Sequence, residues 1–417
     1  MIKYDKFELE NGLKVLVHED KSTPLVAMNI VYNVGARDEN PGRTGFAHLF
    51  EHLMFEGSEN IKNYDEPLQN AGGTNNAFTS NDITNYYLTV PAENIETAFW
   101  LESDRMNGLA FSQEKLEIQQ KVVIEEYKQS YLNQPYGDIW LLLHPLCYKV
   151  HPYKWPTIGE KIEHIADASL QDVKDFFFAH YAPNNAILTL AGNISAVKAK
   201  ELAEKWFATI PRRNVAPRNL PVEPLQTKEN RLVVERDVPA DAFLMAFKME
   251  DRMHENYYHM DLLSDVLSNG KSTRLYEELV KKKGIFNEVS AFIFGSIDPG
   301  LFIFFGRLAE GFSIAEGEAA IWEIIEDVKK NGVAEKELEK VKNKLISSEK
   351  FDLVSVQNLA MKLAFAELLG DSELINKEFE IYKNVTVADL QKAAIDYLLK
   401  ERCNIIEYKA SPITEVV

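Results

Sequence analysis

The residues most able to do chemistry form one short run, His48-Leu-Phe-Glu51-His52. On a helix, positions i and i+4 lie on one face, about one turn apart. His48 and His52 can then bind a single Zn²⁺ through ring nitrogens, while Glu51 lies beside the metal and can hold a water. The chain has only nine histidines, so this arrangement is improbable by chance. We therefore predict a catalytic metal site here.

The residues around this run predict a buried helix over positions 45–56. Its apolar positions are Phe46, Leu49, Phe50, Leu53 and Met54. Buried imidazoles and a carboxylate would cost free energy unless a metal or hydrogen-bond partners satisfied them. A structural helix with hydrogen-bonded histidines is the alternative, which the spacing disfavours.

A catalytic zinc also needs a third protein ligand and an open water position. None of the other seven histidines forms a second close pair with a carboxylate on a helix. Glu125 and Glu126 lie in a strong helical pattern over residues 113–130. Either glutamate alone would more often be a solvated surface residue. The residues by themselves leave the third ligand open between these two.

The strands and helices that must position these residues form two groups along the chain, one before and one after a proline-rich segment. Strand patterns at 7–17, 26–34, 84–90 and 186–191 alternate with helical patterns at 92–106, 113–130 and 196–208. Residues 211–224 contain four prolines without a period and resemble a linker. Strands at 231–236, 242–248, 291–294 and 301–305 follow, then helices over 313–370 and a helix and strand over 386–408. We predict an α+β fold with domains 1–212 and 231–417, joined by 213–230, as an internal duplication.

Composition excludes several classes of protein. The 417 residues include 46 Lys and Arg against 64 Asp and Glu, a net charge of −18, which argues against binding to nucleic acid or an anionic membrane. The sequence contains no run of 18 apolar residues, so we expect no membrane-spanning helix. The mixed, charged first residues do not resemble a secretory signal, so we expect a cytoplasmic protein with Cys147 and Cys403 reduced.

His48, Glu51 and His52, followed by Glu126, resemble the zinc motif of the pitrilysin/insulinase metallopeptidases, in particular the mitochondrial-processing-peptidase-like group. That family carries His-x-x-Glu-His and a glutamate ligand at a similar distance, here 126 − 52 = 74 residues. The register of Val122-Val-Ile-Glu-Glu126 favours Glu126 over Glu125. Five further stretches resemble family segments: 42–57, 72–79, 151–159, 181–186 and 270–279.

The resemblance implies a zinc endopeptidase that cleaves unfolded peptides. His48, His52 and Glu126 would hold one Zn²⁺, and Glu51 would act as the general base on a zinc-bound water. Each half would be a mostly antiparallel sheet covered by helices, and the two halves would form one half of a clamshell chamber, closed in a dimer.

The resemblance also implies how the substrate is held. The peptide would add a strand at Asn76, Ala77 and Phe78, although Phe78 could equally be a core aromatic. Gln119, seven residues before Glu126 where many relatives carry a glutamate, is a candidate to orient a ligand histidine, against the alternative of a solvated helix residue. The net charge predicts a preference for basic peptides.

One departure from the family concerns the second half. Many active relatives carry an Arg and a Tyr there that hold the substrate carbonyl, and alignment places Val280 and Asn287 at those positions. We expect a zinc-less homologous partner subunit to supply the pair. The alternative is a self-sufficient homodimer that uses other donors, such as the lysines at 281–283.

Two other function classes stay open at this stage. A non-catalytic scaffold subunit of the same family would usually have lost the zinc ligands, which are all present here. A zinc hydrolase for a small non-peptide substrate is disfavoured by the strand around Asn76. The metal need not be zinc in vitro, because intrinsic affinity does not favour zinc over copper.

Overall fold

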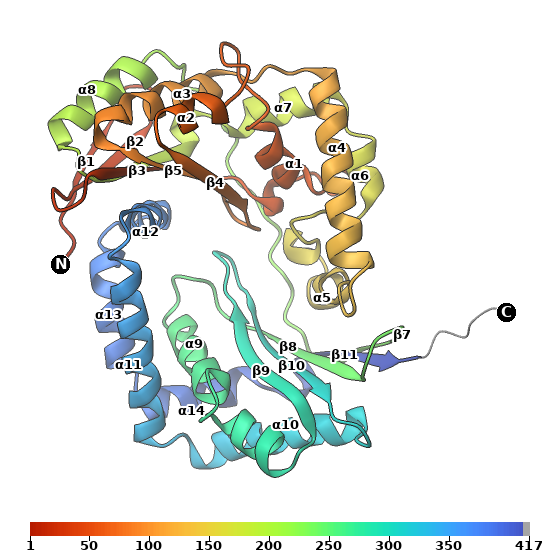
Figure 1. The fold of residues 1–417 in the computed structure, drawn as a ribbon. Coiled ribbons are helices and arrows are strands. Elements are labelled where there is room, and N and C mark those ends of the chain that lie inside the picture. Colours follow the sequence, from red (N-terminus) through yellow and green to blue (C-terminus); the bar gives the residue numbers. More distant parts are fainter. Residues whose placement is uncertain (412–417) are drawn as a thin grey trace. The chain divides into compact units, whose positions relative to one another are not determined.

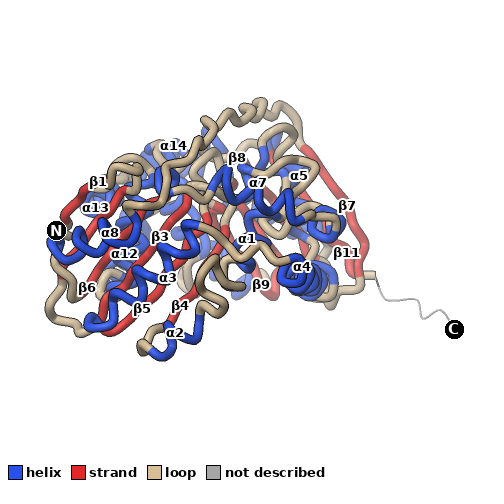
Figure 2. The backbone as a smooth tube through the Cα atoms, turned by 90° about the horizontal axis from the view of Figure 1, so that it is seen from above, coloured by secondary structure: helices blue, strands red, loops and turns tan. Residues whose placement is uncertain are grey.

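The computed structural model describes residues 1–411, and they divide into two compact units. The first unit contains residues 1–128, 155–221 and 349–377. The second contains residues 129–154, 222–348 and the chain from Glu378 onward. Each unit is built on one sheet covered by helices (Figures 1 and 2). The mixed α+β class expected from the sequence is confirmed.

The first unit contains a six-stranded sheet in the order β1-β2-β6-β3-β5-β4. Neighbouring strands are antiparallel except β2 and β6, which are parallel. The strands are β1 (Asp5–Glu8), β2 (Lys14–Glu19), β3 (Leu25–Tyr32), β4 (Thr74–Thr79), β5 (Thr84–Pro91) and β6 (Ala186–Gly192). A hairpin turn that contains Asn11-Gly12 joins β1 to β2, and β4 is an edge strand.

Helices cover both faces of this sheet. α12 packs on β3 and β6, while α3 contacts β5, α8 contacts β2, and α1 contacts β4 and β5. The helices of the unit are α1 (Phe46–Leu53), α2 (Asp65–Asn70), α3 (Ile95–Asn107), α4 (Gln113–Tyr127), α6 (Ile162–Ala166), α7 (Leu170–His180), α8 (Ala196–Phe207) and α12 (Val356–Leu368). The helices α11 (Glu335–Asp352) and α13 (Leu374–Asn384) continue from one unit into the other.

The second unit contains a five-stranded sheet in the order β7-β11-β8-β10-β9. Its strands are β7 (Asn230–Arg236), β8 (Ala242–Lys248), β9 (Phe286–Phe294), β10 (Leu301–Leu308) and β11 (Cys403–Ala410). Its helices are α5 (Ile139–Cys147), α9 (Glu255–Ser268), α10 (Ile314–Asn331) and α14 (Val387–Tyr397). The side chains of α9, α10 and α14 belong to one hydrophobic core, and those of α5 belong to a second.

The two sheets repeat one topology. β7 and β11 are parallel, as β2 and β6 are, and the other neighbouring pairs are antiparallel. Taken in chain order, β7 to β11 therefore occupy the places of β2 to β6, and β1 has no counterpart. This shared order supports the internal duplication that the sequence predicted from element order alone.

Two segments lie in the other unit from the one that a division at 213–230 assigns. Residues 349–377 join the first unit, where Leu359 and Ala360 of α12 are buried with Ala27 of β3 and Ala191 of β6. Residues 129–154 join the second unit, where α5 is buried with β8 and β11. Periodicity shows that a helix has an apolar face but not which sheet that face covers. The proline-rich segment 211–227 forms neither helix nor strand, as expected.

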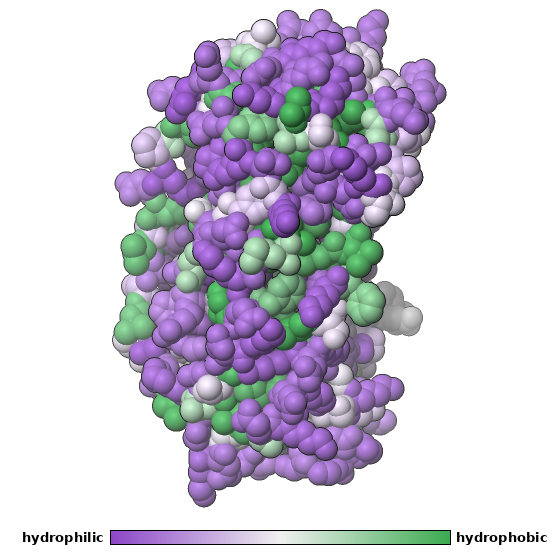
Figure 3. Space-filling view, turned by 90° about the vertical axis from the view of Figure 1, so that its left-hand side faces the viewer, coloured by the Kyte–Doolittle hydropathy of each residue, from purple (hydrophilic) through white to green (hydrophobic). Residues whose placement is uncertain are grey.

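Among the described residues, no helix combines the length and apolar character needed to cross a membrane. Figure 3 shows one face of the molecule, on which hydrophilic side chains predominate and hydrophobic areas are small.

The helix α1 begins at a glycine that no other residue replaces easily. Gly45 has φ +87°, and a Cβ there would lie 2.7 Å from the Ile158 carbonyl oxygen and 2.8 Å from Ile165 Cδ1. The buried Glu39 carboxylate accepts hydrogen bonds from the Gly45 and Ala47 amides, at 2.9 and 2.8 Å. These hydrogen bonds satisfy two of the amides that a helix N-terminus leaves unpaired, while burial raises the pKa of the Glu39 carboxyl.

We expect Gly45→Ala to lower the free energy of unfolding by about 2–4 kcal/mol, because the left-handed backbone and the two close contacts both oppose a methyl group. Gly42→Ala is the control: its Cβ would meet only Asn40 Oδ1, at 3.5 Å. Urea denaturation of both variants tests the expectation. Equal stabilities of the two variants would contradict it.

Candidate metal centre

The histidine run lies on α1, whose apolar side is buried as the sequence predicts. Phe46, Leu49 and Phe50 are at most 3% exposed. The Phe50 ring packs against Phe176 and Tyr181, both with ring centroids 5.1 Å away. This packing fixes the helix, so the three polar residues at 48, 51 and 52 share its remaining side.

His48, His52 and Glu126 converge on one point, the only group of three potential metal ligands found among residues 1–411. The Nε2 atoms of His48 and His52 are 3.3 Å apart. Glu126 Oε2 lies 3.7 Å from His48 Nε2 and 3.6 Å from His52 Nε2. Glu125 points elsewhere and pairs with Lys128, at 2.6 Å. The geometry therefore selects Glu126 over Glu125.

This donor triangle fits a tetrahedral metal ion. Bonds of about 2.0–2.1 Å to three corners of a tetrahedron require the donor atoms to lie about 3.3–3.4 Å apart. The observed edges of 3.3, 3.6 and 3.7 Å are close to that value. Two imidazoles and one carboxylate are also the donor set of catalytic zinc sites that leave one position open.

Protonation of the three ligands is set by burial and by their mutual contacts. Burial lowers the pKa of the His48 imidazole to about 4. Burial also opposes protonation of His52, but its hydrogen bond to Glu126 and the nearby charges outweigh this and raise its pKa. The hydrogen bond with His52 lowers the pKa of the Glu126 carboxyl. Two of the three ligands are thus held in the metal-binding form well below neutral pH.

Glu51 lies on the same helix but is not one of the three converging ligands. Thr79, at the end of β4, donates a hydrogen bond from Oγ1 to Glu51 Oε2, at 2.6 Å. Burial raises the pKa of the Glu51 carboxyl, although the Thr79 hydrogen bond works in the opposite direction. A carboxylate with a raised pKa beside a metal site is a better proton acceptor than an ordinary glutamate.

Gln119 contacts a ligand histidine, which is the candidate role that the sequence analysis set against a solvated helix residue. It lies on α4, two helical turns before Glu126, and its Oε1 atom is 3.2 Å from His52 Nδ1. Its amide nitrogen donates to Glu56 Oε1, at 2.5 Å. The alternative of a purely solvated helix residue is therefore wrong.

The predicted substrate strand is the edge strand β4. It pairs only with β5 among the described strands, so its other side is unpaired. Phe78 is 40% exposed, which excludes a core role for this aromatic ring. The Asn76 side chain accepts a hydrogen bond from the Ala77 amide, at 2.9 Å, which leaves that amide directed away from β5. An edge strand of this kind can accept an added peptide strand.

Three neighbouring residues escaped the sequence analysis: Glu39, Glu56 and Thr79. Glu39 holds the start of α1, Glu56 holds Gln119, and Thr79 holds Glu51. Thr79 directly follows the predicted substrate strand, a signal that could have been used. No local pattern indicates the roles of Glu39 and Glu56, because both act through contacts between separate elements.

The second-half positions that lack Arg and Tyr have structural roles in the second unit. Val280 packs against its hydrophobic core, and Asn287 donates to the Leu308 carbonyl, at 3.0 Å. Arg274 is bound to Glu337 and Asp327. The three lysines at 281–283 each pair with a glutamate. These cations are therefore engaged within their own unit.

Comparison with known families agrees with the division of roles between the two halves. Residues 14–159 match the family described as Insulinase (Peptidase family M16). Residues 167–345 match the Peptidase M16 inactive domain. All four residues of the candidate site, Glu51 included, lie in the first of these regions.

Similar proteins include named zinc proteases. The zinc protease PqqE of Helicobacter pylori is 29% identical over 410 residues, which is 95% of this chain and 90% of that protein. The crystal structure of a protease from Helicobacter pylori matches with a TM-score of 0.92 and 27% identity, covering 98% of this chain and all of the other. The beta subunit of the mitochondrial-processing peptidase of Saccharomyces cerevisiae is 27% identical over 247 residues, 58% of this chain and 53% of that protein.

The pKa directions predict how Zn²⁺ binding depends on pH. Because a proton and the metal compete for His52, whose pKa is raised, the dissociation constant should rise as pH falls below that pKa. The slope should be about tenfold per pH unit, for one proton. It should steepen only near pH 4, where His48 also takes up a proton. Chelator competition across pH measures the slope, and a two-proton dependence beginning near neutral pH would contradict the assignment.

Proposed function

Since the chain belongs to the insulinase family of peptidases, M16, we propose that it is a zinc-dependent endopeptidase acting on unfolded peptides. One observation carries the proposal: the metal-ligand triangle of His48, His52 and Glu126 lies beside a half-buried carboxylate, Glu51, that a residue of an edge strand holds in place. Ligands, general base and substrate strand thus occupy one site within the first unit.

His48, His52 and Glu126 would hold the zinc ion. When bound, the ion supplies Lewis acidity, which polarises a scissile carbonyl and makes a water more acidic. The apolar packing around α1 keeps the two imidazoles on a rigid element, so the ligands are arranged before metal or substrate arrives.

Glu51 would act as the general base. Thr79 holds the carboxylate in place through Oε2, and one carboxylate oxygen would accept a proton from the attacking water. The same oxygen would deliver that proton to the nitrogen of the leaving amine. The raised pKa of Glu51 suits both directions of transfer, because a weaker acid in the ground state is a better base for water.

The substrate would bind as an added strand along β4. The unpaired edge offers backbone groups at alternate residues, among them the Ala77 amide that Asn76 now occupies. Asn76 would have to release this amide when a peptide binds. Recognition by backbone hydrogen bonds demands an extended peptide and tolerates varied sequences.

Two features of the second half favour a partner subunit. Val280 and Asn287 cannot donate as Arg and Tyr do, and the neighbouring cations are paired inside their own unit. We propose that a homologous zinc-less subunit supplies the two donors. The alternative, a non-catalytic scaffold, is opposed by the complete set of ligands and Glu51.

The partner proposal predicts slow peptide hydrolysis by the purified chain alone. Addition of a homologous subunit that carries the Arg and Tyr should raise kcat by about 10²-fold or more. The reason is that one positioned hydrogen-bond donor to the oxyanion typically contributes a factor of that size to kcat. The same subunit with both residues replaced by Ala and Phe is the control. Equal rates for the chain alone and the mixture would contradict the proposal.

The proposed role of Glu51 predicts that Glu51→Gln lowers kcat/KM for a quenched unstructured peptide by about 10²–10⁴-fold while zinc content stays at one per chain. Glu125→Gln is the matched control, because Glu125 is exposed and pairs only with Lys128 among the contacts that the structure shows for it. Metal analysis and peptide hydrolysis on the assembly with the higher activity provide both readings. Retained hydrolysis in Glu51→Gln would refute the mechanism.

A further inference from the structure

We propose that Glu56 is a positioning residue for the metal site: its carboxylate orients Gln119, and Gln119 in turn fixes the ring of His52. The chain of contacts is short and continuous. Gln119 Nε2 lies 2.5 Å from Glu56 Oε1, and Gln119 Oε1 lies 3.2 Å from His52 Nδ1. The inference rests on the proposed function only in taking His52 as a metal ligand.

The direction of these hydrogen bonds follows from the chemistry of the groups. An ionised carboxylate can only accept hydrogen bonds, so the amide NH₂ of Gln119 must face Glu56. The amide oxygen then faces His52, and an oxygen there requires a proton on Nδ1. Without metal, Nε2 of His52 donates to Glu126; when a metal takes the place of that proton, the Nδ1 proton stays and the lone pair of the ring is on Nε2, the atom that faces His48 and Glu126. Glu56 therefore selects the His52 tautomer that can bind a metal.

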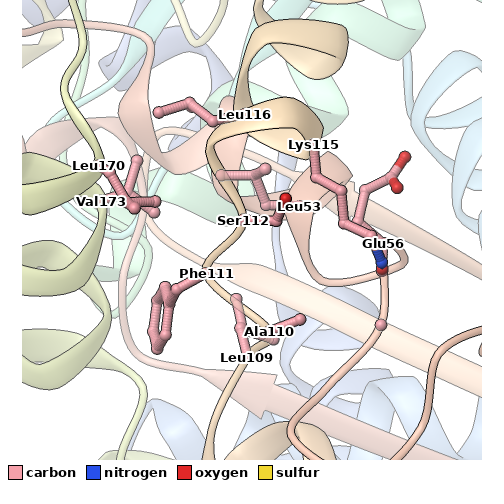
Figure 4. Close-up of a pocket in the computed structure, with 11 residues that line it drawn as sticks. Leu53, Glu56, Leu109, Ala110, Phe111, Ser112, Lys115, Leu116, Leu170 and Val173 are labelled. Carbon is pink, nitrogen blue, oxygen red and sulfur yellow. The ribbon is translucent and has the colours of Figure 1, made fainter.

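The backbone holds Glu56 in place independently of its side chain. α1 ends at Leu53, and the turn that follows leads to Gly57, where φ is +103° and a Cβ would lie 2.7 Å from the Ile61 carbonyl oxygen. The Lys115 ammonium group donates to the Glu56 carbonyl oxygen. Figure 4 shows Lys115 and Glu56 side by side at the rim of a small cavity, about 20 Å³, otherwise lined mainly by apolar residues such as Leu53 and Leu116.

The contacts from Glu56 through Gln119 to His52, here called the relay, serve only one of the two ligand histidines. His48 Nδ1 is buried and has no hydrogen-bond partner among residues 1–411. The tautomer of His48 is thus not set by a second residue in the same way. Removing the relay should therefore affect His52 alone, which gives the proposal a signature that general loosening of the site would lack.

A simpler interpretation is that the Glu56–Gln119 hydrogen bond only holds the turn after α1 against α4, as a structural contact. The apolar contacts of Leu53 and the Lys115 hydrogen bond already join the two elements without the Glu56 carboxylate. If the contact were only structural, its removal would lower the stability of the metal-free protein. A relay changes the His52 tautomer and the affinity for zinc, and leaves stability nearly the same.

The experiment compares Glu56→Ala, Gln119→Leu and the double variant with the full wild-type chain. Chelator competition gives the Zn²⁺ dissociation constant, and ¹⁵N NMR of the metal-free protein, at a pH above the raised pKa of His52, gives the tautomer of each histidine ring. We expect each single variant to bind Zn²⁺ about 10- to 100-fold more weakly, as is typical when the partner of a ligand histidine is lost. The double variant should be no weaker than the weaker single variant, and only the His52 ring should lose its Nδ1 proton.

Glu59→Ala is the matched control. Glu59 is an exposed carboxylate three residues away that bonds to Asn107, so its removal changes the net charge by the same amount. The relay is overturned if Glu56→Ala binds Zn²⁺ within twofold of wild type, if Glu59→Ala weakens binding equally, or if the two single effects multiply in the double variant. Wild type that binds no Zn²⁺ would instead overturn the proposed function, and the tautomer in the metal-free protein would still decide the relay.

Discussion

The contact between α1 and α4 is the constraint on which the site depends. α1 carries both histidines and Glu51, but a helix of eight residues offers no third ligand on that face. α4 supplies Glu126 to complete the triangle and Gln119 to hold His52. Neither helix can bind a metal alone. The buried apolar side of α1 is therefore a functional requirement, because it fixes the distance between helices at which three donor atoms meet.

Three of the polar contacts around this site come from residues outside α1. Glu39 stabilises the start of α1, Thr79 of β4 binds the carboxylate of Glu51, and Glu56 engages Gln119. The Thr79 contact also joins the general base to the strand on which the peptide is proposed to bind. Binding and catalysis would thus share one piece of backbone, so a peptide that displaces β4 would also displace Glu51.

The sequence predicted the parts of this account that follow a local period. His48 and His52 stand out because i and i+4 share a helix face. Gln119 was only a candidate, because its spacing of two turns from Glu126 fits a solvated helix residue as well. The choice of Glu126 over Glu125 came from resemblance, since no physical period links residues 74 apart. Contacts made only by tertiary pairing, such as Glu56 to Gln119, left no local signal. For the same reason the sequence could not show that α12 covers the first sheet.

The most direct test of the account is an anomalous-difference map at the zinc absorption edge from crystals of the full chain grown with Zn²⁺. The account predicts one peak per chain about 2.0–2.1 Å from the Nε2 atoms of His48 and His52, and about 2.0–2.2 Å from a carboxylate oxygen of Glu126. A peak bound by other residues, or the absence of a peak at this triangle under saturating Zn²⁺, would contradict it.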